Sequence, residues 1–600
     1  MNYCTRANSV LICLFIVLSQ SNALFGQTPH DGKDAVSFSP QVFMTESRLY
    51  HGYFVFRSII KNNDAVPHKV VLSCPNVAAK NYELRPGETI NASLPLPVTN
   101  PDFGDSIQVT VDNKKLDPIP CPMRKSWRSH YLTARSFGSH SYDPEIMECN
   151  SFLVCRSLRS QLAEMEAIFA EADCKQWPQD RLDYSCLDVI LLTPAELSAA
   201  PDGVQTALRE FVLAGGVLWL FDCENQKDDL DKIEWIVQLK EETSPNAMKE
   251  YNQFQCLEYP VAFGRVVLSN FTPEKFRSLY LSNKSNKNII IDIYQCFDFQ
   301  FSSRIIWFDK QDLNEWHRSF PIANDLSIPV LGIGFVIFLF VMLAGPVNLF
   351  LLTKYNKRIW LLVTVPALSF LFASAILLYV ILSEGFKTDT RIAVGSYLDQ
   401  RNGMYSSMIQ YAFYARTTPR NVVFDSNDEL NIMDDNNDNA RLSIDWTSGK
   451  QIIHSHFVPV RKPAYYKVRK TGTTRLKLDF DFNAENPYVV NGLGKDVDQL
   501  FVRSEDGSLW RAESVKAGQK AQLTSVNQYF DEANKKQPFA YPACIASSTW
   551  NFSKSSVSNL SKTLPPQCYI VTFDSPGPFT NKGISYAKEK ESFGFLMGRF

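Results

Sequence analysis

The sequence predicts a multidomain α+β membrane protein, built from a β-sandwich, a doubly wound α/β domain, a two-helix transmembrane hairpin and a C-terminal β-sandwich. Two long uncharged apolar stretches lie in the middle of the 600-residue chain. Short β-type runs precede and follow them, and an alternation of strand-like and helix-like segments lies between the first β-type runs and the apolar stretches. We assign residues 1–23 to a signal peptide, 24–125 to the sandwich, 126–325 to the α/β domain, 326–385 to the hairpin and 386–600 to the last β-rich domain.

The overall charge excludes one class of partner. The chain carries 61 Lys+Arg against 63 Asp+Glu, a net charge of −2. A nucleic-acid partner held by a global basic field is therefore not expected. The 45% content of hydrophobic residues is sufficient for ordinary buried cores, and a chain of this length suggests roughly three or four domains.

The N-terminus has the features of a cleaved secretory signal. An apolar stretch runs from Val10 to Leu18, and the small residues Ser21 and Ala23 follow it at a spacing that suits signal peptidase. The apolar stretch is shorter than the roughly 20 residues that a membrane-spanning helix needs. An uncleaved anchor is the alternative interpretation, and the signal peptide sends residues 24 to 325 outward.

The next segment has the pattern of a β-sandwich. Runs such as "YHGYFVFRSIIKNND", "HKVVLSC" and "SIQVTVDNKK" are separated by Asn-Asp and Pro-Gly turn signals. Short strands with turn signals at this spacing are typical of an immunoglobulin-like sandwich. Modules of this kind more often present surfaces than perform chemistry.

The pattern then changes to alternating strands and helices. "LDVILLTP" and "VLWLFDC" are predicted as buried strands, and "LRSQLAEMEAIFAEA" as a helix. In "DGVQTALREFVLAGG", helical spacing places Val204, Ala207, Leu208, Phe211 and Val212 on one face. Two glycines then end this helix. Alternation of this kind predicts a parallel sheet with helices on both faces.

Two apolar stretches, Ile328 to Thr353 and Ile359 to Ser383, contain no charged side chain and are each long enough to span a bilayer as a helix. Lys354, Lys357 and Arg358 lie between them. The positive-inside rule therefore places the loop 354–358 in the cytoplasm and both large domains outside. A buried helical hairpin of a soluble protein is the alternative.

Two prolines interrupt the hairpin at matched depths. Pro346 precedes Lys354, and Pro366 follows Arg358, by the same number of residues, so we expect both helices to kink at a common level. Asn348 is expected either to bond across the hairpin or to satisfy backbone groups that the nearby proline frees. Because neither stretch contains Asp, Glu, Lys, Arg or His, a transporter formed by this chain alone is disfavoured.

The C-terminal region returns to β-type patterning, with Asp506-Gly507 as the signal for a type I′ hairpin turn. Two features there could bind a metal, and the sequence does not decide either case. The segment from Asp434 to Asp445 has part of the spacing of a calcium loop but lacks its Gly and its final Glu. His454 and His456 share a strand face, but no third ligand is evident nearby. No metal or other cofactor is therefore predicted.

Export permits disulfides. Cys74 with Cys121, and Cys544 with Cys568, each fall within one predicted β region and are the preferred pairs. Sequence alone cannot fix this connectivity.

Two segments carry a resemblance to a known family. "LDVILLTPAELSAAPDGVQTALREFVLAGGVLWLFD" resembles the extracytoplasmic domain with a class I glutamine amidotransferase-like fold that occurs in uncharacterised bacterial membrane proteins. "GPVNLFLLTKYNKRIWLLVTVPAL" resembles the Gly-Pro-Val-Asn transmembrane hairpin that follows this domain in them. The resemblance covers about residues 130 to 390, and it implies a bacterial inner-membrane location.

The catalytic chemistry of that fold is not expected here. Active members hold a Cys on a tight strand-to-helix turn flanked by glycines, with a His and a carboxylate that follow later. Cys223 lies near that point but between Asp222 and Glu224, whose charges would raise the thiol pKa. No His-x-Glu element follows in the domain, so we predict that it is degenerate and not an enzyme.

Three functions are carried forward. The leading hypothesis is a non-enzymatic, membrane-anchored extracytoplasmic scaffold or accessory subunit, with the bilayer and other proteins of a membrane complex as partners, transport being one setting. The second is a small-molecule-binding ectodomain of unknown ligand, with Thr193, Asp222 and Glu224 at the carboxyl ends of the parallel strands. The third is a divergent hydrolase.

Overall fold

The computed structural model of the protein describes residues 35–41, 52–75, 77–97, 106–120, 152–157, 164–169, 177–187, 189–242, 246–247, 256–273, 317, 320–322, 330–356, 358–384, 388–432, 443–454, 457–526 and 564–600. Within this part the chain is mostly β-strand and forms several sheets, with a group of helices in one segment and two long apolar helices in another. This mixture of sheets and helices confirms the coarse α+β prediction. The predicted signal peptide lies outside the described residues.

The first strands form one face of an N-terminal unit. An antiparallel sheet contains β1 (Val36–Gln41), β2 (Tyr53–Asn62) and β5 (Thr89–Pro97) in the order β1-β2-β5. Phe56 of β2 and Leu94 of β5 are buried in the same core as Val70 and Leu72 of the neighbouring sheet. The two sheets thus pack face to face through alternate apolar side chains.

The second sheet joins strands that precede the two long apolar helices in the sequence to strands that follow them, and we call it the joint sheet. Its order is β18-β21-β20-β4-β3-β6-β7, with β8 paired to β6. The strands are β3 (His68–Cys74), β4 (Ala78–Leu84), β6 (Ser106–Val111), β7 (Lys114–Lys115), β8 (Ile119–Pro120), β18 (Asn421–Asp425), β20 (Ser443–Asp445) and β21 (Lys450–His454).

The connection between the two halves of the joint sheet is parallel. Ile444 of β20 faces Ala78 of β4, and its amide donates a hydrogen bond to the carbonyl of Val77 at 2.8 Å. The amide of Trp446 donates to the carbonyl of Ala79, also at 2.8 Å. Strands separated by the whole hairpin therefore share one hydrogen-bonded ladder, which the sequence did not indicate.

The α/β segment forms a seven-stranded sheet in the order β10-β9-β11-β12-β15-β14-β13. Its elements are β9 (Phe152–Ser157), β10 (Glu164–Phe169), η4 (Arg181–Tyr184), β11 (Val189–Leu192), α3 (Pro194–Ala199), α4 (Asp202–Leu213), β12 (Val217–Leu220), α5 (Lys227–Leu230), α6 (Glu234–Glu242), β13 (Asn246–Ala247), β14 (Cys256–Val261) and β15 (Gly264–Ser269).

Two details of this segment differ from prediction. Only β11, β12 and β15 are mutually parallel, and antiparallel strands flank them. β14 and β15 must be antiparallel because a two-residue turn joins them, with Ala262 at φ 50°. Residues 164–169, predicted as part of a helix, form β10 against β9, so pairing in the sheet overrides helix propensity here.

The predicted helix at 202–213 is confirmed. All five apolar residues expected on one face of α4 are buried. Gly215, at φ 106°, ends the helix, and the amide of Gly216 donates to the carbonyl of Phe211 at 2.9 Å. Close packing explains Gly264, since a Cβ there would lie 2.1 Å from the carbonyl oxygen of Val212.

The post-hairpin chain builds a ten-stranded sheet, which we call the central sheet, in the order β19-β22-β17-β16-β31-β29-β25-β26-β28, with β30 paired to β16. Its strands are β16 (Thr388–Asp399), β17 (Met404–Ala415), β19 (Glu429–Ile432), β22 (Pro463–Thr473), β25 (Val497–Arg503), β26 (Leu509–Val515), β28 (Thr524–Ser525), β29 (Cys568–Phe573), β30 (Lys588–Glu589) and β31 (Phe593–Arg599). A small sheet of β23 (Lys477–Asp481), β24 (Tyr488–Gly492) and β27 (Lys520–Gln522) packs on one end of it.

The hairpin turn between β25 and β26 is present but of another type. Gly507 has φ 86°, whereas Asp506 has no positive φ, as a type I′ turn would require. The amide of Gly507 donates to the carbonyl of Ser504 at 3.1 Å. The Asp-Gly pair thus ends a type I turn with its glycine in the left-handed region.

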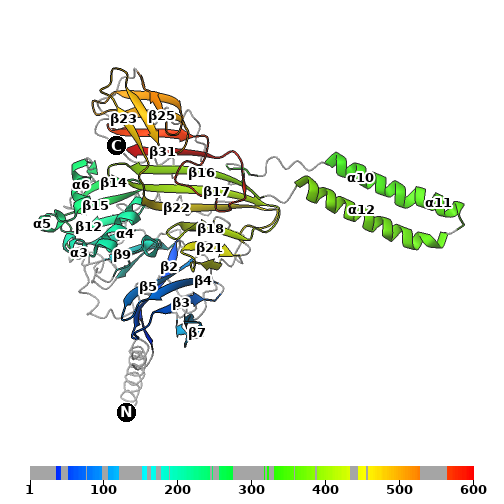
Figure 1. Ribbon diagram of the computed structural model, residues 1–600, viewed down its shortest axis with the longest axis horizontal. Coiled ribbons are helices and arrows are strands. Elements are labelled where there is room, and N and C mark those ends of the chain that lie inside the picture. Colours follow the sequence, from blue (N-terminus) through cyan, green and yellow to red (C-terminus); the bar gives the residue numbers. More distant parts are fainter. Residues whose placement is uncertain are drawn as a thin grey trace, which may run out of the picture.

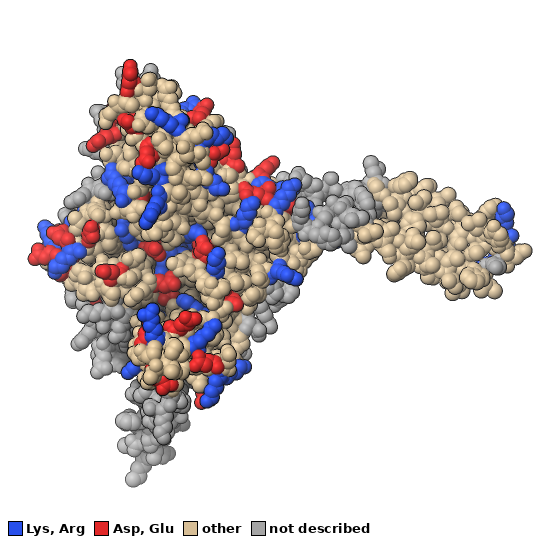
Figure 2. Space-filling model, in the orientation of Figure 1, with Lys and Arg blue, Asp and Glu red and all other residues tan. Residues whose placement is uncertain are grey.

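The two apolar helices project away from the rest of the molecule (Figure 1). The first comprises α10 (Val330–Met342), the π-helical turn η5 (Leu343–Val347) and α11 (Asn348–Lys354), and the second comprises η6 (Arg358–Trp360) and α12 (Leu361–Glu384). Two stretches, Gly334–Lys354 and Arg358–Leu378, are long and apolar enough to cross a membrane. On the tan part of the projecting pair, Figure 2 shows charged side chains only at the tip, where the loop lies.

Candidate functional site

Thr193, one of the predicted ligand-binding residues, caps a helix. It precedes α3, and its Oγ1 accepts a hydrogen bond from the amide of Glu196 at 3.3 Å. The Glu196 carboxylate accepts in return from the Thr193 amide at 2.8 Å. Because both polar groups of Thr193 are used in this capping box and the residue is only 5% exposed, its local role is structural.

Asp222 occupies the sharp turn after β12. Its backbone has φ 53°, an uncommon conformation for a residue other than glycine. Its two carboxylate oxygens accept from the side-chain amides of Asn225 at 2.6 Å and Gln226 at 3.3 Å. Glu224 is exposed. The strand end therefore holds Asp222 in a network with its own loop, and we find no observation that favours a ligand there.

Cys223 follows the strained residue and is buried against its own strand. Its Sγ lies 3.4 Å from the carbonyl oxygen of Leu220. Burial raises the pKa of the Cys223 thiol to about 12, and the neighbouring carboxylates of Asp222 and Glu224 act in the same direction. A thiol that stays protonated at neutral pH is not an activated nucleophile. A nucleophile on a tight strand-to-helix turn has a left-handed backbone conformation. Here Asp222, and not Cys223, has that conformation.

The predicted metal and disulfide residues are only partly described. Asp445 accepts from the amide of Thr447 at 2.7 Å, and its other oxygen lies 3.6 Å from Nε2 of His454. Residues 434–442 of the calcium-like segment, and His456, lie outside the described residues. Among the residues that the structure describes, no group of three or more His, Cys, Asp or Glu side chains could hold a metal ion.

The described part of the chain contains no disulfide. Cys74 and Cys568 are buried, and burial raises the pKa of the Cys568 thiol to about 12. Their expected partners, Cys121 and Cys544, lie outside the described residues. Both pairs stay predictions.

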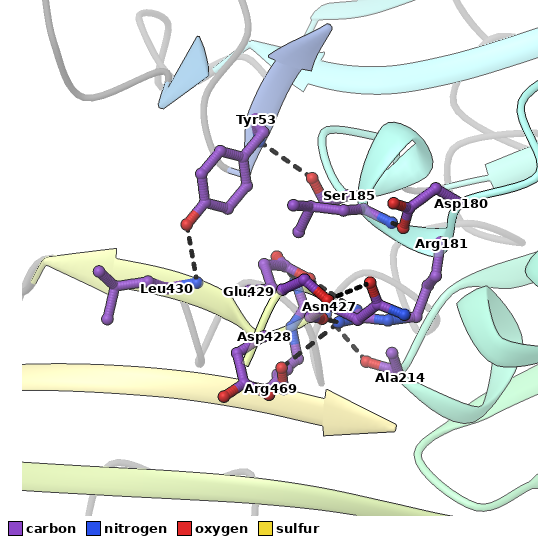
Figure 3. Close-up of polar contacts among 12 residues, drawn as sticks. Tyr53, Asp180, Arg181, Ser185, Ala214, Asn427, Asp428, Glu429, Leu430 and Arg469 are labelled. Atoms are coloured by element: carbon purple, nitrogen blue, oxygen red, sulfur yellow. Dashed lines mark hydrogen bonds and ion pairs between the residues drawn. The ribbon is translucent and has the colours of Figure 1, made fainter. Parts of the chain in front are cut away.

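The most developed polar arrangement lies where three parts of the chain meet (Figure 3). Glu429 of β19 accepts from two arginines: from Nη1 of Arg181 at 3.3 Å and, through its other oxygen, from Nη2 of Arg469. The three side chains are between 1% and 3% exposed. We call this buried group the ion-pair junction, and it links η4 to β19 and β22.

Other donors of the two guanidinium groups bond to backbone carbonyls, whereas the buried Nε of Arg181 has no hydrogen-bond partner among the described residues. Arg469 donates through Nη1 to the carbonyl of Ala214 at 2.9 Å, beyond the end of α4. Arg181 donates through Nη2 to the carbonyl of Asn427. Arginine suits a buried site of this kind because its planar group donates several hydrogen bonds at fixed angles.

Tyr53 ties the N-terminal strands to the same place. Its amide donates to Oγ of Ser185 at 3.0 Å, and its hydroxyl donates to Oε1 of Gln451 at 3.1 Å. The hydroxyl oxygen also accepts from the amide of Leu430 at 3.4 Å. Burial raises the pKa of Tyr53 above its ordinary value, so the phenol stays neutral. Residues before and after the hairpin are thus joined by buried hydrogen bonds.

Two buried carboxyls lie near the junction. Burial raises the pKa of Asp428 to about 6, against the opposing effect of the nearby Lys470 ammonium. Burial, followed by the charge of Asp180, raises the pKa of Asp183 to about 7. Desolvation disfavours the ionised form of each. These groups lie inside the molecule, where they affect stability rather than exposed chemistry.

Inside the hairpin, Asn348 forms hydrogen bonds with the second helix, which confirms the first of the two roles that the sequence suggested for it. Its Nδ2 donates to Oγ1 of Thr364 at 2.8 Å, and Thr364 donates back to its Oδ1 at 3.2 Å. Pro346 lies in the π-helical turn η5, just before Asn348, whereas α12 continues through Pro366. The kinks themselves stay a prediction, as does the cytoplasmic location of Lys354, Lys357 and Arg358, of which Lys357 is not described.

The chain segment that leads into the hairpin and the strand that follows it are held together. Arg391 of β16 donates through Nη1 to the carbonyl of Pro321 at 2.8 Å. Its guanidinium carbon lies 4.8 Å from the ring centre of Phe320. Nδ1 of His317 lies 3.1 Å from the hydroxyl oxygen of Tyr465 in β22. The described residues 317 and 320–322, which precede the hairpin, are therefore held against the central sheet, and β16 of the same sheet follows the hairpin.

Comparisons with known proteins identify no family. No model of a known protein family matches the chain, and no curated protein matches it. Solved structures give distant partial likenesses. An M1 zinc metallopeptidase from Deinococcus radiodurans is 12% identical with a TM-score of 0.13, over 23% of this chain and 39% of that one. The yeast delta-COP-I mu-homology domain is 9% identical with a TM-score of 0.15, over 35% of this chain and 95% of that domain.

These likenesses carry no argument about activity. The chain spans about two fifths of the metallopeptidase chains that it matches, and the TM-scores are far below those of a shared fold. The resemblance to bacterial membrane proteins with an amidotransferase-like domain thus stays a prediction.

Proposed function

We propose that this protein is a non-enzymatic, membrane-anchored extracytoplasmic scaffold or accessory subunit of a membrane complex. In this proposal a signal peptide directs export and both large parts of the chain lie outside the bacterial inner membrane. The hairpin spans the bilayer, and the loop 354–358 lies in the cytoplasm. The partners are the lipid bilayer and other proteins of the complex, and no cofactor is required.

One observation carries the proposal: the hairpin emerges from within a single interlocked body. The parallel pairing of β4 with β20 and the ion-pair junction join the chain before the hairpin to the chain after it. In such an arrangement both ends of the hairpin continue into the same folded body, so the anchor is joined to the body at two points. A body fixed at two points suits the holding of partners better than a single flexible tether would.

The surface of the hairpin supports a role in assembly. Large apolar side chains along both helices are exposed, with Phe350 at 70%, Phe370 at 76% and Leu362 at 80%. Within the described stretches that could cross a membrane, no charged side chain precedes Lys354 or follows Arg358. Such a surface can contact lipid or the apolar helices of a partner, whereas ion or proton conduction would need ionisable groups.

The test is to identify what contacts the hairpin in the native membrane. A photo-crosslinking amino acid is placed at Leu362 or Phe370 in the full-length protein, and at the exposed external residue Val66 as the matched control. We expect a defined protein adduct from the hairpin positions and co-purification of that protein in mild detergent. A chain that always purifies alone, and crosslinks only to lipid, would refute the scaffold role.

A further inference from the structure

The end of the central sheet next to the hairpin carries a cluster of exposed basic and apolar side chains. α12 ends at Glu384 and β16 begins at Thr388. The three intervening residues span at most about 14 Å when fully extended. Thr388 faces Ala415 of β17, and Asp389 faces Lys588 of β30. This end of the sheet therefore lies within one short linker of the membrane-spanning helix.

We define the collar as the exposed residues that neighbouring chain segments contribute to this end. Val460 bridges to Ala415, which brings the segment before β22 alongside the end of β17. Glycine 583 accepts from the amide of Val423 at 2.8 Å, which brings the segment before β30 alongside β18. The collar consists of Arg420, Val460, Arg461, Lys462, Lys582, Tyr586 and Lys588, all of them exposed.

The charge of the collar is basic after pairing is taken into account. Among the described residues, three acidic groups at this end have basic partners: Asp389 with Arg416 at 3.0 Å, Glu589 with Lys582 at 3.6 Å and Glu591 with Arg391 at 3.7 Å. Lys590 adds a further positive charge 3.9 Å from Asp389.

Three basic residues of the collar stand apart from these pairs. Among the described residues, Arg420, Lys462 and Lys588 form no ion pair. Figure 2 shows Lys and Arg side chains, with Asp and Glu side chains among them, on the body around the base of the hairpin.

Two large apolar side chains are also exposed in the collar. Tyr586 is 56% exposed and Val460 is 43% exposed. Among described residues outside the hairpin, only two other large apolar side chains are comparably exposed, Val66 and Leu257. Tyrosine is favoured at the membrane–water interface because its ring is apolar and its hydroxyl is polar. Basic side chains around it supply attraction to phosphate headgroups.

We propose that the collar docks on anionic lipid headgroups of the leaflet that the body faces, and so fixes the orientation of the body on the membrane. This rests on the proposed anchoring, because the hairpin brings the collar to the bilayer. Arg420, Lys462 and Lys588 contact lipid phosphates, and Tyr586 and Val460 enter the interfacial region. Because the collar belongs to a large folded body, its charges do not oppose the topology set by the short loop.

The test uses the full-length protein in nanodiscs of neutral phosphatidylcholine, or of the same lipid with phosphatidylglycerol. Amide hydrogen exchange is followed in peptides that cover 458–463 and 582–588. We expect slower exchange in the anionic discs and loss of this protection at high salt. Each basic residue near an anionic surface changes the docking equilibrium about fivefold. The triple variant Arg420→Gln, Lys462→Gln, Lys588→Gln should therefore weaken docking about a hundredfold.

The matched control replaces three exposed basic residues far from the collar: Lys114→Gln, Arg475→Gln and Lys495→Gln. Arg475 follows β22 at the end of the sheet opposite the collar. We expect the control variant to keep full protection in anionic discs. Equal loss of protection in both variants would overturn the proposal, because it would show a general charge effect.

Two further comparisons in the hydrogen-exchange experiment use only the unmodified protein. Equal exchange of the unmodified protein in neutral and anionic discs would overturn the docking. Equal protection in neutral discs after addition of inorganic phosphate would also overturn it, because a free anion would then be the ligand. A protein that fails to enter the discs at all would refute the anchoring, whereas one that enters them without lipid-dependent protection would refute the docking alone.

Discussion

Replacing Glu429 by alanine should destabilise the folded body that surrounds the ion-pair junction more than any single surface change. The substitution leaves Arg181 and Arg469 buried, at 2% and 3% exposure, without their shared carboxylate. Removing one partner of a buried ion pair costs about 3–5 kcal/mol, because the remaining charge keeps its desolvation penalty. Against a total stability of about 5–15 kcal/mol, this is a large fraction.

Graded variants of the junction separate charge from packing. Glu429→Gln keeps the shape and an acceptor oxygen but loses the charge, so we expect a loss of about 2 kcal/mol, within the range for a hydrogen bond to a charged group. The triple variant Arg181→Met, Glu429→Leu, Arg469→Met removes all three charges. It should cost less than Glu429→Ala, since no unpaired charge remains and buried triads are often replaceable by apolar residues.

The measurement is guanidinium-induced unfolding of the full-length protein in detergent, followed by tryptophan fluorescence. Because the junction joins residues before and after the hairpin, we also expect the two parts of the body to unfold in one transition. Glu505→Ala, at an exposed acidic residue in a turn, is the control and should change stability by less than about 0.5 kcal/mol. A loss below 1 kcal/mol for Glu429→Ala, or separate transitions for the two parts, would refute the reasoning.

Three further predictions follow from buried groups. Because the pKa of Asp183 is raised to about 7 in the folded state, stability contributed by its neutral form is lost as pH rises from about 4 to 7. Asp183→Asn should remove up to about 4 kcal/mol of this loss, and parallel unfolding profiles against pH for the two proteins would contradict it. A double-mutant cycle with Asn348→Val and Thr364→Val, measured in bicelles, should give a coupling of about 0.6 kcal/mol, and no coupling would contradict the observed pair. Gly264→Ala should cost at least about 2 kcal/mol in thermal unfolding, because the added Cβ would meet two backbone oxygens. Gly334→Ala, with open space around it, should be neutral. Equal melting temperatures for the two variants would argue against close packing at Gly264.

The features that sequence predicted well are local. Two uncharged apolar stretches of membrane length are readable from composition alone, and the structure forms helices there. The buried face of α4 follows from apolar spacing, and its end follows from two glycines. Asn348 was marked as the polar group within an apolar helix, and its partner, Thr364, lies across a hairpin whose short loop limits the possible neighbours.

Features that depend on distant contacts were missed. The pairing of Ile444 with Ala78 joins residues separated by the whole α/β segment and by the hairpin, and no local pattern specifies such a register. Glu429 and Arg181 look like ordinary surface residues in sequence, because a buried charge is recognisable only by its partners. The strand at 164–169 was missed for the same reason, since its pairing with β9 outweighs local propensity.

One structural role could have been read from sequence. Thr193 is followed three residues later by Glu196, and that spacing is the signature of a capping box before a helix. Its position at a strand end made it look like a ligand group, although the same position is where a following helix begins. Asp222 is similar, since its carboxylate is used by the side chains of its own turn.

The joint sheet and the junction together constrain the order of assembly. In the proposed topology, the chain before the hairpin is exported first, when β4 still lacks β20 and Arg181 still lacks Glu429. An unpaired strand edge and an unpaired buried cation both favour incomplete or mispaired states. Both are satisfied only after residues 388 to 600 have followed to the same side. For a hairpin that spans the membrane as proposed, completion of the fold therefore requires that both of its ends lie on one face of the membrane. A two-helix anchor is the shortest insertion that returns the chain to that face.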